Sequence, residues 1–247
     1  MRLTRHIAIV ASGDNGFSLT NPFDCTVYLI DGGSECALID AGAGLEPNLI
    51  LDRIRDVGYS PTDIRKILLT HGHGDHAGGA AALREACGAT VFAMQPTADF
   101  VARGDLEALS LKSAMDAGVY AADYVFRPCP VSPVTDGQCI HVGELSLTVV
   151  ASEGHSAGHC CYLLEQNGHR SLFAGDAVQS GGKIALQAIW DCDLQAYVKT
   201  IRRLAALHPD ALFPGHGCFA AERGWRHTDI AAQALRSLSL PKNSIGE

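Results

Sequence analysis

The chain has 247 residues, of which 47% are hydrophobic and 19% charged, and its formal net charge at pH 7 is -8. This length suits one domain with a large buried core, and the composition is that of a globular protein. The negative charge argues against a nucleic-acid partner, because phosphates need a basic face, and no apolar run has transmembrane length.

The N-terminal residues 1–11 contain two arginines but an apolar run of only five residues, which is too short for a signal peptide. We therefore expect a cytoplasmic protein with neither a membrane nor a nucleic-acid partner. The nine cysteines are scattered and include no Cys-x-x-Cys pair, so they indicate neither a disulfide framework nor a zinc ribbon. Most are expected to be small buried side chains.

The first part of the chain predicts strands followed by a helix. β-rich runs predict strands at 6–11, 25–30 and 37–40, with a hairpin-type turn at 31–33. Apolar residues at helical spacing then predict a helix over 49–57, which Gly58 ends.

Residues 71–76 read His-Gly-His-Gly-Asp-His and form the densest group of metal-ligand types in the chain. The apolar run 66–70 before them predicts a buried strand, and the alanine-rich run 80–86 after them predicts a helix. They therefore lie on a strand-to-helix loop, where a rigid scaffold can direct several side chains to one point. Three imidazoles and a carboxylate suit zinc, iron or manganese. A surface loop that is merely rich in histidine is the weaker alternative.

The pattern His71-x-His73-x-Asp75-His76 resembles the signature of the metallo-β-lactamase-fold superfamily. Asp40 of Asp40-Ala41-Gly42 is similar to the Asp-x-Gly that precedes this signature in the family. The resemblance implies that Asp40 supports the metal site from beneath without binding metal. A carboxylate that only forms a turn is the alternative interpretation.

A strand is predicted at 89–93, and residues 95–133 form an insert that we expect to be mostly helical, at 98–103 and 106–117, with a proline-rich exit at 128–133. In the superfamily such an insert commonly covers the metal site, while an insert that only packs is equally open here. Five residues are candidates for lining a substrate pocket: Tyr120, Tyr124, Arg127, Lys183 and Trp190.

The second half carries three further motifs in the family's order. Strands at 138–142 and 145–150 precede Gly154-His155, and the resemblance makes His155 a ligand and the nearby His159 a structural support. A strand at 171–176 ends in Asp176, and a strand at 211–213 leads to His216 in Pro-Gly-His-Gly. Residues 155–162 look particularly like the glyoxalase II and thioesterase branch.

Two helices complete the second half. Asp193 is the predicted N-cap of a helix that runs to about residue 205, because its apolar residues form one stripe. A last helix is predicted at about 220–238, and the segment after Pro241 is expected to fray.

The resemblance covers nearly the whole chain and implies one α+β domain over residues 1–247. This is the αββα four-layer sandwich, in which two mixed β-sheets lie face to face between layers of helices. It implies two divalent metal ions, with Zn²⁺ expected first and Mn²⁺ or Fe²⁺ possible in the same site. The implied ligands are His71, His73 and His155 for the first ion, Asp75, His76 and His216 for the second, and Asp176 bridging both.

The site implied by the resemblance hydrolyses an activated acyl bond of a small-molecule substrate, either a thioester or a lactone, with a metal-bridging hydroxide as nucleophile. Asp75 would also accept a proton from the attacking water. Asp176 departs from the superfamily's typical β-lactamases, which have no bridging carboxylate there. The sequence also shows no C-terminal helical domain like the one with which glyoxalase II binds glutathione, so the site is glyoxalase II-like but a glutathione thioester is not expected.

Three other functions stay open at this stage. A phosphodiesterase or RNA-processing nuclease uses the same two-metal site, although the acidic balance disfavours it. An iron-dependent sulfur dioxygenase needs one iron, which the full second ligand set disfavours. A non-catalytic metal-binding protein on the same fold is the last alternative. The role of Cys218, two residues beyond His216, also stays open.

Overall fold

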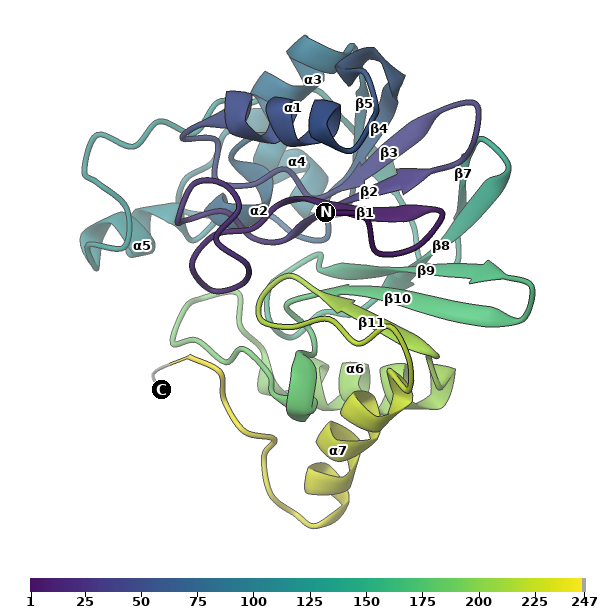
Figure 1. Cartoon of the computed structure of the whole chain (residues 1–247). Coiled ribbons are helices and arrows are strands. Elements are labelled where there is room, and N and C mark those ends of the chain that lie inside the picture. The colour runs from purple at the N-terminus through teal and green to yellow at the C-terminus, as the bar shows by residue number, and fades with distance from the viewer. Residues whose placement is uncertain (246–247) are drawn as a thin grey trace.

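The computed structural model describes residues 1–245, in which two β-sheets lie face to face with helices on their outer sides (Figure 1). The strands are β1 (Ile7–Ala11), β2 (Val27–Asp31), β3 (Cys36–Ile39), β4 (Ile64–Leu68), β5 (Thr90–Met94), β6 (Val131–Val134), β7 (Cys139–Val142), β8 (Leu145–Ala151), β9 (Cys160–Gln166), β10 (His169–Gly175) and β11 (Ala211–Pro214). The helices are α1 (Pro47–Asp56), α2 (Gly74–Ala77), α3 (Ala80–Cys87), α4 (Thr97–Arg103), α5 (Leu111–Asp116), α6 (Leu194–Leu207) and α7 (Trp225–Arg236), with 3₁₀ turns η1 (Pro61–Asp63) and η2 (Ser180–Gly182).

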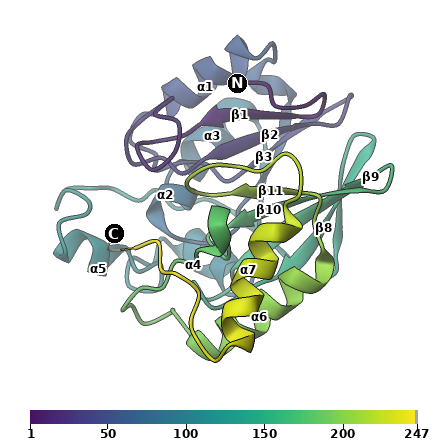
Figure 2. The same cartoon turned by 60° about the horizontal axis from the view of Figure 1, so that its bottom comes forward.

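The chain order divides the strands between the sheets. The first sheet has the order β1-β2-β3-β4-β5-β6 and the second the order β11-β10-β9-β8-β7. Each sheet is mixed, since β3 to β6 are parallel while β1 to β3 are antiparallel, and β10 pairs parallel with β11 but antiparallel with β9. Helices α1 and α3 cover the first sheet, and α6 and α7 cover the second (Figures 1 and 2). The α+β, αββα fold class predicted from the sequence is confirmed.

The core between the sheets explains the near-continuous apolar strands. Residues of β1 and β3 are buried throughout, as expected for strands covered on both faces. At its centre Phe173 of β10 stacks on Phe213 of β11 at 5.1 Å between ring centroids, and the Tyr28 ring meets both edge-on at 5.5 Å. Each buried aromatic ring of this kind stabilises the fold by about 1.5–3 kcal/mol through the apolar area removed from water.

One edge of the sandwich collects the carboxyl ends of strands from both sheets. Strands β3 and β4 are parallel neighbours, as are β10 and β11, so their carboxyl ends meet at the same edge. Two tyrosine hydroxyls join the sheets there: Tyr162 donates to the Leu69 carbonyl at 2.8 Å, and Tyr28 donates to the Pro214 carbonyl at 2.7 Å. The loops at this edge are therefore held in fixed relative positions.

The insert differs from the prediction in two places. The helix expected at 106–117 is limited to α5, because Ser110 adopts a left-handed backbone conformation with φ of 55° just before it. The proline-rich exit leads directly into β6, an edge strand that accommodates Pro133 because its outer side is unpaired.

The strand β9 was not predicted at all, and it places Cys160, Cys161 and Tyr162 in the second sheet.

The segment after Pro241 does not fray within the described residues. Its Asn243 side chain accepts a hydrogen bond from the Leu186 N–H at 2.9 Å and donates one to the Leu186 carbonyl at 3.0 Å. The Ile184 N–H donates to the Lys242 carbonyl, and the Ser244 N–H donates back to the Ile184 carbonyl. We call residues 241–245 the C-terminal strap. Residues 246 and 247 lie outside the described part, and within residues 1–245 no helix has the length and hydropathy needed to cross a bilayer.

Candidate metal centre

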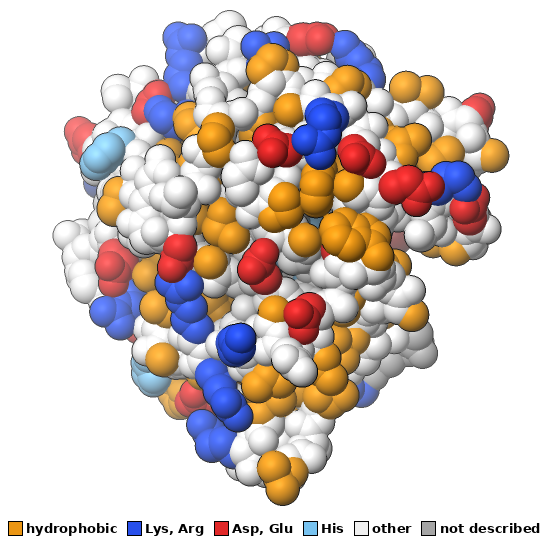
Figure 3. Space-filling model, turned by 180° about the vertical axis from the view of Figure 1, so that it is seen from behind, with side chains coloured by type: hydrophobic (Ala, Val, Ile, Leu, Met, Phe, Trp, Pro, Cys, Tyr) orange, Lys and Arg blue, Asp and Glu red, His pale blue; other side chains and the backbone are white. Residues whose placement is uncertain are grey.

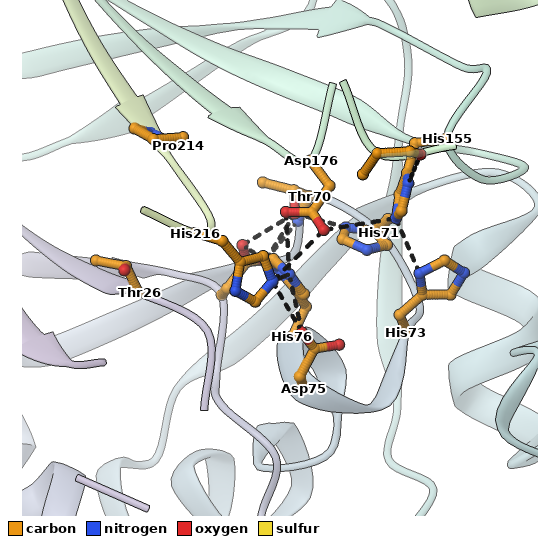
Figure 4. A network of polar contacts seen from close by, with 12 residues as sticks. Thr26, Thr70, His71, His73, Asp75, His76, His155, Asp176, Pro214 and His216 are labelled. Carbon is orange, nitrogen blue, oxygen red and sulfur yellow. Dashed lines mark hydrogen bonds and ion pairs between the residues drawn. The ribbon is translucent and has the colours of Figure 1, made fainter. Parts of the chain in front are cut away.

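Loops after four strands deliver seven histidine and aspartate side chains to one point (Figure 4). The loop and short helix α2 that follow β4 supply His71, His73, Asp75 and His76. The loops after β8, β10 and β11 supply His155, Asp176 and His216, respectively. Gly215 is needed here, since a Cβ at that position would lie 2.5 Å from the His76 ring and 2.6 Å from Asp176 Oδ1.

His71, His73 and His155 form the first group, with one nitrogen from each lying within 4.8 Å of the others. His155 donates its Nδ1–H to the Ala185 carbonyl at 2.8 Å, which leaves Nε2 as an acceptor, 3.0 Å from His73 Nδ1. His71 Nδ1 lies 3.0 Å from the Thr70 hydroxyl, so its Nε2 is the nitrogen that faces the group. His71 and His155 therefore present the lone pairs of their Nε2 atoms to a shared point.

Asp75, His76 and His216 form the second group by the same criterion. His216 Nε2 lies 3.0 Å from Asp75 Oδ2 and 3.2 Å from His76 Nε2. His76 donates its Nδ1–H to Asp40 at 2.8 Å, since a carboxylate only accepts, and this fixes Nε2 as the nitrogen that faces the group. Asp75 is the most exposed member, with 25% of its side chain accessible.

Asp176 lies between the two groups. Its Oδ2 is 3.6 Å from His155 Nε2 of the first group and 3.5 Å from His216 Nε2 of the second. His159 supports this position from behind: its Nδ1 donates to the Ser152 hydroxyl at 2.8 Å, and its Nε2 accepts from the Asp176 N–H at 3.2 Å. Both ring nitrogens of His159 therefore have protein partners, as a structural support requires.

Asp40 links the two loops that follow β3 and β4. Its carboxylate accepts hydrogen bonds from the Thr70 N–H at 2.7 Å, from the Thr70 hydroxyl and from His76 Nδ1. Because Thr70 in turn contacts His71, one buried carboxylate orients a histidine in each group. Such outer partners fix the tautomer and direction of a metal-binding imidazole.

Burial and neighbouring charges set the protonation of the cluster. Burial, reinforced by the other imidazoles, holds the pKa of His71 well below its usual range and lowers that of His155 to about 4. Burial alone would raise the pKa of the Asp75 carboxyl, but His76 and His216 outweigh it and lower the pKa to about 2. The pKa of Asp176 is shifted in the same direction, against burial, by His216 and His76. Against burial, neighbouring acidic groups, Asp75 and Asp176 among them, raise the pKa of His76 and His216. The imidazoles of His71 and His155 and the two carboxylates are therefore in the states that bind a divalent cation, whereas His76 and His216 would release a proton on binding one.

Two buried atoms show that this cluster fits metal ions. Within the described residues, His71 Nε2 and Asp176 Oδ1 are buried without a hydrogen-bond partner. A buried polar atom without a partner costs about 1–3 kcal/mol, so native proteins rarely keep one without a reason. Both atoms point into a set of nitrogen and oxygen donors of the types that zinc, manganese and iron take. The ligand assignments stay predictions, but the seven residues are together as predicted.

A cavity of about 940 Å³ opens from the cluster. Apolar lining residues from the insert include Leu109, Leu111, Val119 and Tyr120, and the lining also includes Lys183 and residues 244 and 245 of the C-terminal strap. The insert packs directly on the motif, because a Cβ at Gly74 would lie 2.7 Å from the Leu111 side chain and 3.1 Å from the Tyr120 hydroxyl. The insert therefore covers the motif and also lines the cavity.

Three of the five predicted pocket residues are placed elsewhere. Tyr124 is buried behind Tyr120, where its hydroxyl donates to the Ala43 carbonyl at 2.7 Å. Arg127 is exposed and pairs with Glu85, and Trp190 is 59% exposed with its indole N–H on the Glu107 carbonyl. None of these three lines the cavity within residues 1–245, which corrects the prediction for them. Cys218 is exposed and does not line it either.

Sequence reasoning missed two residues near the cluster. Thr70 precedes the motif directly, so its position beside the predicted ligands was a usable signal. Asp191 is buried on the loop before α6, and its Oδ2 lies 3.5 Å from His73 Nε2. Nothing local in the sequence marks Asp191, because its neighbour Asp193 carries the recognisable N-cap pattern. Asp193 is confirmed as that cap, since its carboxylate accepts from the Gln195 and Ala196 N–H groups.

A model of the metallo-beta-lactamase superfamily matches residues 20–216 of the chain. The lactamase-like protein aptB of Emericella nidulans is 30% identical over 190 residues, which cover 77% of this chain and 50% of that protein. The atrochrysone carboxyl ACP thioesterase dmxR1 of Cryptosporiopsis sp. is 26% identical over 94% of this chain and 60% of its own length. The thioesterase pkgB of Emericella nidulans is 30% identical over 77% of this chain and 45% of its own. The chain thus spans about half the length of these curated relatives.

Solved structures share the fold. A metallo-beta-lactamase family protein of Thermus thermophilus superimposes with a TM-score of 0.73 at 23% identity, covering 96% of this chain and 81% of its own. A metallo-beta-lactamase of Cronobacter sakazakii gives 0.69 at 22% identity, covering 88% of each chain. At these identities the likeness extends to the fold alone.

Proposed function

Because the chain belongs to the metallo-beta-lactamase superfamily, we propose that it hydrolyses an acyl thioester with two divalent metal ions bound at the seven-residue cluster. The observation that carries this proposal is the position of Asp176, whose Oδ2 lies 3.6 Å from a histidine of the first group and 3.5 Å from one of the second. A carboxylate in that place can be shared by two cations.

The donor set suits a catalytic centre. Seven donors shared by two ions leave positions for water and substrate, whereas a structural site is closed by protein ligands. Two divalent ions bound there supply an activated water at neutral pH and positive charge for the substrate's carbonyl oxygen. Zinc is the first expectation, and manganese or iron suits the same donors.

The chain's own residues orient and enclose the reaction. Asp75 faces the cavity, and its ionised carboxylate can accept a proton from the attacking water, although its low pKa makes it a weak base. The apolar wall formed by Leu109, Leu111 and Val119 suits the acyl part of a small-molecule substrate. The names of two relatives, both thioesterases, favour a thioester over a lactone. The cytoplasmic location expected from the sequence stays a prediction.

The nuclease alternative has less support. Among the described residues that line the cavity, Lys183 is the one Lys or Arg, against the carboxylates of Asp14, Asp24, Asp75 and Asp176. Figure 3 shows acidic and basic side chains mixed over one face of the molecule, with a few basic ones gathered at its lower left. A polyphosphate backbone would need more positive charge beside the reacting centre.

The test is hydrolysis by purified protein of an acyl-CoA, an acyl-glutathione, an N-acylhomoserine lactone and a bis-aryl phosphate. Each substrate is assayed with the protein as purified, after chelation, and after Zn²⁺ is added back. We expect chelator-sensitive turnover of a thioester that Zn²⁺ restores. Turnover of the lactone or the phosphate diester alone would reject the thioesterase proposal, and turnover that survives complete metal removal would reject metal dependence.

A further inference from the structure

Most histidines of the cluster have an outer ring nitrogen that is held by the protein. His71 Nδ1 lies against the Thr70 hydroxyl at 3.0 Å, His76 Nδ1 against Asp40 at 2.8 Å, and His155 Nδ1 against the Ala185 carbonyl at 2.8 Å. Each contact fixes the tautomer of its imidazole and leaves Nε2 for the centre of the cluster.

His73 is oriented the other way round. Its Nδ1 faces the cluster, 3.0 Å from His155 Nε2, so its outer nitrogen is Nε2. Within the described residues this buried nitrogen has no hydrogen bond of ordinary geometry. The acceptor that faces it is Asp191 Oδ2, at 3.5 Å.

Asp191 is itself fixed in place. Only 8% of the residue is exposed, and its other oxygen, Oδ1, accepts a hydrogen bond from the Ser110 hydroxyl at 2.7 Å. The neighbouring Trp190 indole donates to the Glu107 carbonyl at 3.0 Å, which ties the same loop to the insert. Oδ2 is thus an acceptor on a fixed carboxylate of a buried residue, and the buried, unpartnered His73 Nε2 is the ring nitrogen directed at it.

We propose that Asp191 is the positioning residue of the first metal site. Its Oδ2 accepts the His73 Nε2–H, which keeps Nδ1 unprotonated and directed at the cation. A movement of a few tenths of an ångström brings the 3.5 Å contact to hydrogen-bond length. Because Ser110 belongs to the insert, Asp191 also joins the cavity wall to a metal ligand. This inference rests on the proposed metal centre and is independent of which acyl bond is cleaved.

The test is the affinity of purified protein for Zn²⁺, measured by competition with a chromophoric chelator, in wild type, Asp191→Asn and Trp190→Phe. Removing the partner of a metal-binding histidine typically weakens metal binding about 10–100-fold. We expect Asp191→Asn to weaken the first equivalent by about that factor and the second far less. Trp190→Phe removes the indole bond of the same loop but leaves the carboxylate, so its affinities should stay within about twofold of wild type.

A second readout separates orientation from loosening of the loop. In Zn²⁺-loaded wild type, nitrogen NMR should show His73 protonated at Nε2, and in Asp191→Asn that proton should exchange faster. The proposal is overturned if Asp191→Asn binds Zn²⁺ as wild type does, if Trp190→Phe weakens it equally, or if wild type binds none. Because no substrate is used, absence of thioester hydrolysis with normal Zn²⁺ binding would reject the proposed function and leave this inference standing.

Discussion

At the scale of single residues, Asp176 connects the two halves of the cluster. It follows β10, its backbone N–H is held by His159, and its carboxylate contacts a histidine of each group. Asp40 has the complementary role on the other sheet, where it orients His76 and, through Thr70, His71. Asp176 and Asp40 therefore hold the metal-donor side chains that follow strands of the two sheets next to one another.

Replacing Asp176 with Ala removes the shared donor. We expect the variant to lose the second of two metal equivalents and nearly all hydrolysis. Without Asp176 the second group keeps only three protein donors, and no donor is shared between the two ions. Elemental analysis after gel filtration gives the metal content, and near-UV circular dichroism checks the fold. Two retained equivalents together with full turnover would contradict a two-metal mechanism.

Replacing His159 with Ala should affect stability and leave metal content near wild type. Both nitrogens of this fully buried ring bond to protein groups, so the change leaves the Asp176 N–H without its partner and the Ser152 hydroxyl with the Cys161 Sγ contact at 3.1 Å. The free energy of unfolding should fall by about 2–4 kcal/mol. Denaturant titration measures this, and loss of a metal equivalent would show that His159 binds metal.

The residues of the cluster could be predicted because their spacing is local and the motifs follow a known order. The partners of those residues could not be predicted in the same way. Asp191 meets His73 only because two distant loops fold onto one edge, and no local pattern encodes that contact. Trp190 was a candidate for lining the pocket, but its indole instead ties two loops together at the surface.

At the scale of elements, most strands and helices follow from apolar periodicity and turn residues. The exceptions have physical reasons. Strand β9 begins at Cys160, one residue after His159, so the motif concealed where the strand starts. The C-terminal strap is short and polar, and a tertiary contact of the Asn243 side chain holds it against residues 184–186.

The C-terminal strap should stabilise the position of His155 in the first group. Asn243 holds both backbone groups of Leu186, and the adjacent Ala185 carbonyl accepts from His155. We expect Asn243→Ala to lower the free energy of unfolding by about 1–3 kcal/mol and to weaken Zn²⁺ binding measurably. Asn243→Asp keeps the hydrogen bond from the Leu186 N–H, so its free energy of unfolding and its Zn²⁺ affinity should lie between those of wild type and Asn243→Ala. Unchanged stability and Zn²⁺ affinity in Asn243→Ala would show that the strap has no such role.

The insert should decide which acyl groups enter. Ala117 is exposed and lines the cavity just beyond α5, so a tryptophan there would narrow the cavity without disturbing the core. For Ala117→Trp we expect kcat/KM to fall about tenfold or more for bulky acyl thioesters, a loss of about 1.4 kcal/mol, with acetyl thioesters little affected. Ala102→Trp, at an exposed position on α4 outside the cavity lining, is the matched control. Equal losses in both variants would contradict a role of the insert in selectivity.

At the scale of the whole molecule, the cluster forms where the two sheets meet. Donors come from the first sheet through the loop after β4 and from the second through the loops after β8, β10 and β11. The αββα fold was predictable because a family signature and four ordered motifs fix it. The cavity was not, since it depends on how the insert, the loop before α6 and the strap pack around the cluster.

The most direct test of a two-metal thioesterase is to add Zn²⁺ stepwise to metal-free protein and to follow hydrolysis of an acyl thioester after each addition. Donors grouped around two points joined by Asp176 predict that turnover stays low below one equivalent per chain, rises steeply to two, and then stays constant. A plateau at one equivalent, or turnover that does not respond to Zn²⁺, Mn²⁺ or Fe²⁺, would contradict the account.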